Sequence, residues 1–564
     1  MKTQTMKKIM IKFLFWAMIS GTITSTFAQG VQPLRVEIEA KKSSDDYNVV
    51  PVGKDGVILF YESYEKEKGD KIWVFTKYNT ELKEDWNEEV PVQKSLDFIK
   101  YYIDDEKMLY VLLGNMHYVA GQSSELISNN ASGTFQIVSI DISNGNSNII
   151  NSKFPGSLYI RDFKVINDKA SIFCMTSPTK GDACMQMFLT CTCIPAFTGL
   201  TVFKFHSLIM NVNLNNGTFT TIPIKYEGNT LLLDSDIMKD TNTFYKVFVK
   251  NKPNVKTTSN YLIDYSGNGD LIKTSKIKSG SGKLLRTFKY QNLGSEESVI
   301  IGTYDTEKKK GFTFNPANNE SMGLNSVSEG IYFTKMKGEE QKFIKFYPFS
   351  KMENFFKYLK NKTANKVKEK VKKTEKKGKE LNVNYNLLVH KIIEKNGQYI
   401  LIGEAYYPEY RKDSYKTITR DASGVQTGST TTYTYVFIGY RFTHAVIAAF
   451  DSEGNKLWDN SFAIQDILTF NLKEKVKVMF DGDDIILTYS YGGYIKSQII
   501  QGDKIVQGKE DTKIETSLEG DKVKQNWNSD MDFWYDNYFL SWGYQKIKNK
   551  GKRTVFYFNK IGLQ

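Results

Sequence analysis

The stretch LRVEIEAKK, from Leu34 to Lys42, alternates apolar and charged residues, as a strand with one buried face does. No other strands next to it in the sequence would complete a sheet with it. The last part of the chain, from about Asp530 to Gln564, has room for only three strands. If the two segments met, they would complete a four-stranded sheet and leave no unpaired edge in a ring of sheets. The pattern therefore predicts a closed ring.

Short runs of β-branched and aromatic residues recur between these segments, separated by Gly, Asn and Asp, as in antiparallel sheets. Eight runs fit the second strand of a repeated unit: DGVILFYES, EKMLYVLLGN, KASIFCMTS, TFYKVFVKN, ESVIIGTYDT, GQYILIGEAYY, DDIILTYSYGG and NYFLSWGYQKI. Their spacing of roughly 45 to 80 residues is typical of propeller blades with insertions. We predict an all-β chain in which residues 29–564 form a single β-propeller of about eight four-stranded blades. Seven blades are the alternative count, and a pair of β-sandwich domains is the competing fold.

Residues 1–28 have the features of a signal peptide. Four lysines precede an apolar run from Phe13 to Ile19, and small residues lead to a cleavage site after Ala28. The apolar run is too short to span a bilayer of about 30 Å, and no Cys follows Ala28 to carry a lipid. A retained anchor helix is the alternative. We expect export to a compartment where disulfides persist.

The excess positive charge is concentrated in two segments. The formal net charge is +13, and residues 1–28 hold four lysines and no acidic residue. Eleven lysines and three acidic residues fall between Phe356 and Glu380. Because these segments account for nearly all of the excess, the body of the protein is close to neutral, and its charge does not indicate a nucleic-acid-binding protein.

All four cysteines lie close together, in or beside an insertion at residues 175–206: Cys174, Cys184, Cys191 and Cys193. We expect two disulfides among them, although the spacing does not select the pairing. A zinc site is the first alternative, but the C-x9-C-x6-C-x-C spacing lacks C-x-x-C pairs. Buried thiols are the third possibility. The uncharged part of this insertion contains Pro195 and Gly199, which favours a hairpin over a membrane span.

A second insertion, at residues 349–380, is rich in lysine. Phe355, Phe356 and Leu359 have helical spacing and lysines fill the other positions, so we expect a basic helix. It would be either a solvated linker or an arm that contacts an anionic surface or an envelope protein.

A third insertion, at residues 408–438, is rich in Tyr and Thr and predicts a long projecting hairpin. Polar and aromatic residues flank its base and are our candidates for a ligand-binding site: Glu404, Tyr406, Tyr407, Arg441 and His444. A structural hydrogen-bond network at the base is the alternative interpretation.

The sequence contains no recognisable catalytic motif. Its four histidines, at positions 117, 206, 390 and 444, are scattered, and neither H-E-x-x-H nor G-x-S-x-G occurs. We therefore expect no metal site and no cofactor, and catalytic residues stay unknown.

The segments GEAYYPEY, GYRFTHAVIAAFDSEGNKLWD and FWYDNYFLSWGYQKI resemble an uncharacterised group of exported, propeller-like proteins from Bacteroidota. The resemblance covers the C-terminal third and implies no established activity. The final residues, RTVFYFNKIGLQ, do not resemble the sorting domain of surface-secreted proteins in that phylum, which favours the periplasm or the periplasmic face of the outer membrane.

These observations favour a binding or scaffold protein of the cell envelope over an enzyme. The alternative is a carbohydrate-active propeller enzyme, either a glycoside hydrolase or a lyase, that uses carboxylates in the central channel.

Overall fold

The structure is a computed structural model that describes residues 31–562 apart from several gaps. The longest gaps are 118–128, 177–205, 307–327 and most of 360–384, and the others are 41–45, 155–157, 225–228, 239–243, 253–257 and the single residues 281, 295, 421, 466 and 471. Within the described residues, no helix is long and apolar enough to cross a membrane.

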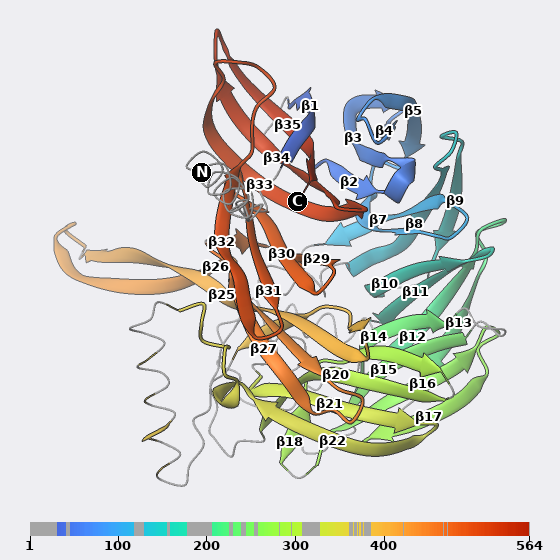
Figure 1. Cartoon of the computed structure of the whole chain (residues 1–564). Coiled ribbons are helices and arrows are strands. Elements are labelled where there is room, and N and C mark those ends of the chain that lie inside the picture. Colours follow the sequence, from blue (N-terminus) through green and yellow to red (C-terminus); the bar gives the residue numbers. More distant parts are fainter. Residues whose placement is uncertain are drawn as a thin grey trace, which may run out of the picture.

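The described strands form a β-propeller made of seven sheets, which follow one another around a central axis (Figure 1). Three of the sheets are plain four-stranded meanders, and the strands in each are consecutive in the chain. Their strands are β2 (Asn48–Pro51), β3 (Val57–Glu67), β4 (Asp70–Tyr78) and β5 (Glu84–Val92); β14 (Asn229–Met238), β15 (Phe244–Lys252), β16 (Ser259–Ser266) and β17 (Leu271–Ile277); and β29 (Lys477–Asp481), β30 (Asp484–Tyr491), β31 (Tyr494–Gln501) and β32 (Lys504–Lys513).

Two further sheets have the same order, but their inner edge is divided into two short strands. Their strands are β18 (Lys283–Leu285), β19 (Lys289–Gly294), β20 (Glu297–Thr306), β21 (Gly330–Lys337) and β22 (Glu340–Pro348); and β23 (Asn386–Val389), β24 (Ile393–Lys395), β25 (Gln398–Arg420), β26 (Gln426–Phe450), β27 (Lys456–Ala463) and the short β28 (Leu468–Thr469).

The remaining meanders share one eight-stranded sheet. Its strands are β6 (Asp97–Ile103), β7 (Met108–His117), β8 (Asn129–Asp141), β9 (Ser147–Lys153), β10 (Leu158–Ile166), β11 (Lys169–Thr176), β12 (His206–Asn213) and β13 (Phe219–Ile224). The two halves are joined where Leu158 and Tyr159 of β10 pair with Asn130 and Asn129 of β8. The preferred count of eight blades is therefore not supported, and the alternative of seven agrees with the number of sheets among the described residues. The count from sequence was too high because it gave each meander a separate sheet.

The ring is closed by the N-terminal strand, as the sequence predicted. β1 (Val31–Glu39) pairs antiparallel with β35 (Lys552–Gly562), and β34 (Tyr538–Lys548) and β33 (Lys522–Tyr535) complete the sheet. Because β1 covers the edge of β35, the last sheet has the four strands that the C-terminal segment alone could not supply.

The hydrophobic core is divided among clusters that lie between neighbouring meanders around the ring. Phe60 of β3 and Val111 of β7, for example, are fully buried in one of them. Such packing leaves the inner strands to surround the axis, and these strands position the site described below.

The third insertion is a two-stranded hairpin. β25 and β26 pair, with three register shifts, from Tyr399 and Phe450, at the base, to Arg420 and Gln426, at the tip. The outer part projects far beyond the body of the propeller (Figure 1).

The expected basic helix of residues 349–380 is not supported. The described part begins with the 3-10 helix η4 (Phe349–Lys351) and continues as turns, and no α-helix is among the described elements. Phe355 and Phe356 are buried in the core between β21 and β25, so burial against the sheets explains the aromatic spacing that suggested a helix. Most of the lysine-rich part lies outside the described residues.

The two predicted disulfides are not shown. Cys174 lies in β11 as a free, fully buried thiol among apolar side chains. Burial raises its pKa far above the usual range, so this thiol is not reactive. Cys184, Cys191 and Cys193 lie outside the described residues, so their pairing stays a prediction.

Candidate functional site

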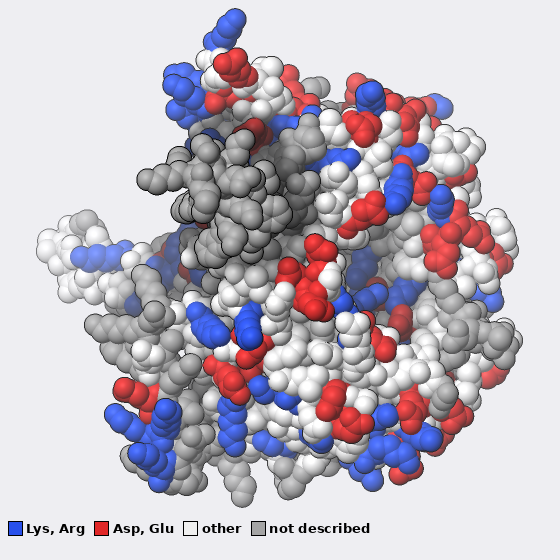
Figure 2. Space-filling model, viewed as in Figure 1, with Lys and Arg blue, Asp and Glu red and all other residues white. Residues whose placement is uncertain are grey.

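A cavity of about 510 Å³ lies on the axis, where the inner strands meet. Every sheet contributes to its wall. The charged residues that line it are Arg161, Arg286, Lys289, Lys473, Glu474, Lys477, Asp530 and Asp532, and the aromatic residues are Tyr47, Phe98, Tyr101, Phe288, Tyr406 and Trp542. Figure 2 shows the opening as a hollow in which Lys and Arg side chains gather. The wall thus has five cationic side chains and three carboxylates.

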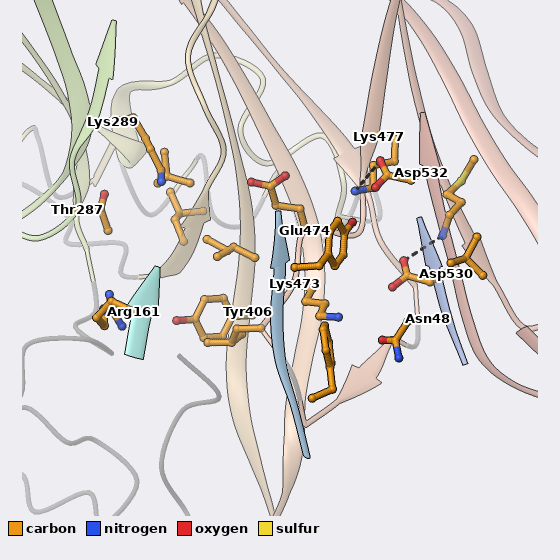
Figure 3. A pocket seen from close by; sticks show the side chains of 18 of the residues that line it. Asn48, Arg161, Thr287, Lys289, Tyr406, Lys473, Glu474, Lys477, Asp530 and Asp532 are labelled. Carbon is orange, nitrogen blue, oxygen red and sulfur yellow. Dashed lines mark hydrogen bonds and ion pairs between the residues drawn. The ribbon is translucent and has the colours of Figure 1, made fainter. Parts of the chain in front are cut away.

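Two ion pairs connect neighbouring segments on one side of the cavity. Lys475 Nζ lies 3.0 Å from Asp530 Oδ2. Lys477 Nζ lies 3.2 Å from Asp532 Oδ1 (Figure 3). In an extended chain, residues two apart point to the same face, so the two lysines and the two aspartates form a regular ladder.

Lys473 continues this series of lysines without an ion-pair partner among the described residues. Lys475 and its partner Asp530 are 55 residues apart in the sequence. The residue 55 positions after Lys473 is Asn528, which carries no charge. The side chain is open to the cavity but is surrounded by protein, and this burial lowers its pKa. Asp530 raises the pKa in part, whereas Lys475, Lys477 and Lys100 lower it further.

Further cations line the cavity, and Figure 3 shows Lys289 and Arg161 on the side away from Asp530 and Asp532. Arg286 pairs with Asp305 at 2.9 Å, and Lys289 pairs with Asp234 at 3.1 Å. The Nε–H of Arg286 is buried and has no hydrogen-bond partner within the described structure. A donor of this kind is costly to leave unsatisfied and is ready to bind an acceptor.

The two aspartates of the ladder differ in acidity. Burial raises the pKa of both carboxyl groups, but the charges of Lys475 and Lys477 outweigh burial at Asp530 and hold its pKa below the usual range. At Asp532 burial dominates over Lys477, and the pKa is raised. The neighbouring Tyr101 has its pKa raised to about 12, chiefly by burial.

Glu404 holds the segment that carries Lys473 in place from behind. Its Oε1 accepts hydrogen bonds from the backbone N–H groups of Lys475 and Val476, at 2.8 and 2.9 Å. His390 Nε2 lies 2.8 Å from the same oxygen, and His390 Nδ1 lies 3.9 Å from Glu474. Because Glu404 is fully buried, it acts as a positioning residue and not as a ligand contact.

The five residues predicted at the hairpin base do not form one site. Among them, only Tyr406 lines the cavity. Tyr407 is 45% exposed, and Arg441 forms an ion pair with Glu409. Glu404 and His444 lie on opposite faces of the sheet, because Glu404 is paired with Ala445 and His444 with Ala405.

The charged wall of the cavity was not predicted from the sequence. A local signal was present, since KEKVK at 473–477 and DMD at 530–532 place like charges two residues apart on strands. Alternation of this kind usually marks a solvent-facing edge, and nothing in it indicates that the two segments face each other. No group of three or more His, Cys, Asp or Glu residues able to hold a metal ion was found in the described part of the chain.

The fold and site together define a β-propeller with a charged central cavity. The sequence matches no known protein family, and no curated protein matches it either. Among solved structures, it is similar to the polysaccharide lyase Uly1, at 10% identity over 94% of this chain and all of that chain, with a TM-score of 0.32.

Two other structures are similarly distant. The β-propeller domain of the Trilobed protease from Pyrococcus furiosus is 8% identical over 84% of this chain and 96% of that domain, with a TM-score of 0.30. Cobalt-substituted Synechocystis ACO is 6% identical, with a TM-score of 0.31, and the match spans 52% of this chain and 59% of the oxygenase. These similarities carry no argument about activity.

Proposed function

We propose that this chain is an exported β-propeller of the cell envelope that binds a small anionic ligand in its central cavity. The supporting observation is the surplus of cations in the wall, together with Lys473, which lacks an ion-pair partner in the described structure. Export is proposed from the signal-peptide features of residues 1–28.

The cavity suits a ligand of this kind in both size and chemistry. Its volume of about 510 Å³ is within the range of small-molecule sites. A carboxylate, sulfate or phosphate group would accept charge-assisted hydrogen bonds from Lys473 or from the Nε–H of Arg286. Aromatic residues such as Tyr101, Tyr406 and Trp542 could contact a sugar ring in the same space.

Calorimetric titration with glucuronate, sulfate and neutral glucose would test this proposal. We expect glucuronate or sulfate to bind more tightly than glucose, and Lys473→Met to weaken the binding by about 10- to 100-fold, the value of a charge-assisted hydrogen bond. Lys504→Met, on the exposed edge strand β32, is the matched control and should leave the affinity unchanged. Equal affinities for the intact protein and Lys473→Met would contradict the proposal.

A carbohydrate-active enzyme is the second candidate, and the contrast between Asp530 and Asp532 favours it. Two carboxyl groups whose pKa values are shifted in opposite directions suit an acid and an ionised base or nucleophile. It ranks second because each carboxylate is already paired with a lysine.

A screen for cleavage of envelope polysaccharides would test the second candidate. If it is correct, Asp532→Asn should lower turnover at least about 100-fold, because it removes the carboxyl group that would act as the general acid. Asp511→Asn, on the exposed strand β32, is the control. Turnover that survives Asp532→Asn would rule out this assignment.

A further inference from the structure

Lys473 differs from the other cationic side chains in the cavity wall. Arg286, Lys289 and Lys477 each form an ion pair with an aspartate, and Arg161 donates to the carbonyl oxygen of Leu233 at 3.4 Å. The amine of Lys473 has no such partner in the part of the chain that the structure describes. Its amine therefore remains available to a molecule that enters the cavity.

The surroundings of Lys473 lower its pKa and so raise the fraction of its amine that is neutral. Burial is the largest cause of its lowered pKa, and the positive charges of Lys475, Lys477 and Lys100 add to the effect, although Asp530 opposes it. A neutral lysine amine is a nucleophile, whereas the ammonium ion is not, and lysines that form imines are activated by burial and neighbouring cations.

We propose that Lys473 reacts reversibly with the carbonyl group of a small aldehyde or keto acid and holds it as an imine. The lone pair of Nζ attacks the carbonyl carbon, and a proton moves from nitrogen to oxygen to give a carbinolamine. The C–O bond then breaks, water leaves and the C=N bond remains, so no oxidant or reductant is required.

Other groups in the wall suit this reaction. Glu474, the next residue, and Tyr101 line the same cavity and can move protons as the carbinolamine forms and loses water. The wall also contains other cations, such as Lys289, that favour a substrate with a carboxylate, which is the part of the inference that rests on the proposed function.

Reductive trapping tests the inference directly. The full chain is incubated with glyoxylate and cyanoborohydride, and the modified lysines are mapped by peptide mass spectrometry. We expect a carboxymethyl group to form first on Lys473 and more slowly on outer-surface lysines such as Lys504, because the lowered pKa of Lys473 provides more of the neutral amine. Lys473→Arg should abolish this fast adduct, and Lys504→Arg should retain it. The melting temperature of each variant shows whether it is folded.

Modification spread evenly over exposed lysines, or a fast adduct that persists in Lys473→Arg, would overturn the inference. A titration with glycolate, which has the carboxylate but no carbonyl group, separates the two proposals. Glycolate binding without trapping on Lys473 overturns the imine and leaves anion binding in place. Trapping on Lys473 without binding of glycolate, glucuronate or sulfate supports the imine and contradicts anion binding.

Discussion

At the residue scale, His444 shows how strongly packing between two sheets shifts the pKa of a side chain. Its ring is fully buried and stacks on Tyr358 with the centroids 3.6 Å apart and the planes 5° apart. Nδ1 lies 2.9 Å from Thr443 Oγ1, and Nε2 has no hydrogen-bond partner in the described structure. Burial lowers the pKa of His444 from 6.5 to about 3, so the imidazole is neutral at physiological pH.

This shift predicts that stability depends on pH. The unfolded chain takes up a proton on His444 near pH 6.5, whereas the folded protein resists protonation until about pH 3. The free energy of unfolding should therefore fall as the pH drops through this window, by up to about 1.4 kcal/mol per pH unit from this group. Urea unfolding at several pH values should show a smaller dependence for His444→Phe, which keeps the stacked ring but cannot titrate.

The exposed His206, at the start of β12, provides the control. His206→Phe should keep the pH dependence of the intact protein. If His444→Phe and the intact protein had the same dependence between pH 6.5 and 3, the low pKa of His444 would be wrong.

At the scale of elements, the segment from Phe349 to Leu359 is a structural brace. Phe349, Phe355 and Phe356 are at most 2% exposed and pack into the cluster between β21 and β25. Phe355 also meets the edge of the His444 ring, with the centroids 5.1 Å apart. The aromatic residues of this segment therefore anchor the chain before the lysine-rich residues begin.

Truncation of Phe355 should destabilise the protein markedly. We expect Phe355→Ala to lower the free energy of unfolding by about 3 to 5 kcal/mol, because it leaves a cavity in a packed core. Lys357→Ala, two residues away on the exposed side, should change it by less than about 0.5 kcal/mol. Chemical unfolding monitored by fluorescence measures both values, and similar losses in the two variants would contradict the docked arrangement.

At the scale of the whole molecule, one strand from the N-terminal end closes the ring. Arg35 of β1 donates to Gln545 Oε1 of β34 at 2.7 Å and to Asn559 Oδ1 of β35 at 3.2 Å. Its guanidinium also lies 4.2 Å from the centre of the Tyr557 ring. Removal of β1 would expose the pairing edge of β35 and would remove these hydrogen bonds.

Deletion of Val31–Glu39 should therefore lower the melting temperature, by on the order of 10 °C, and promote self-association through β35. Calorimetry and light scattering after size exclusion measure the two effects. A shortened hairpin, cut back to Asp413 and Thr434, is the control, because its tip is exposed and lies outside the core. Monomeric protein with an unchanged melting temperature after deletion of β1 would show that the ring does not depend on this strand.

The strands and the closure of the ring could be predicted because their signals are local. LRVEIEAKK shows an alternating strand within nine residues, and a count of strands after Asp530 shows that one is missing. The count of blades was less secure. It depended on whether Asn129 and Asn130 pair with β10, and side-chain periodicity says nothing about which strand edges meet.

The cavity could not be predicted, because its wall combines residues from every part of the chain. Lys475 and Asp530 are 55 positions apart, and Arg161 and Arg286 come from other sheets. The local sequence determines on which face of its own strand a side chain lies. Strands and turns can therefore be inferred from the sequence. The closed ring alone determines which of those faces meet around the axis. It pairs Lys475 and Lys477 with aspartates and, among the residues that the structure describes, gives Lys473 no ion-pair partner.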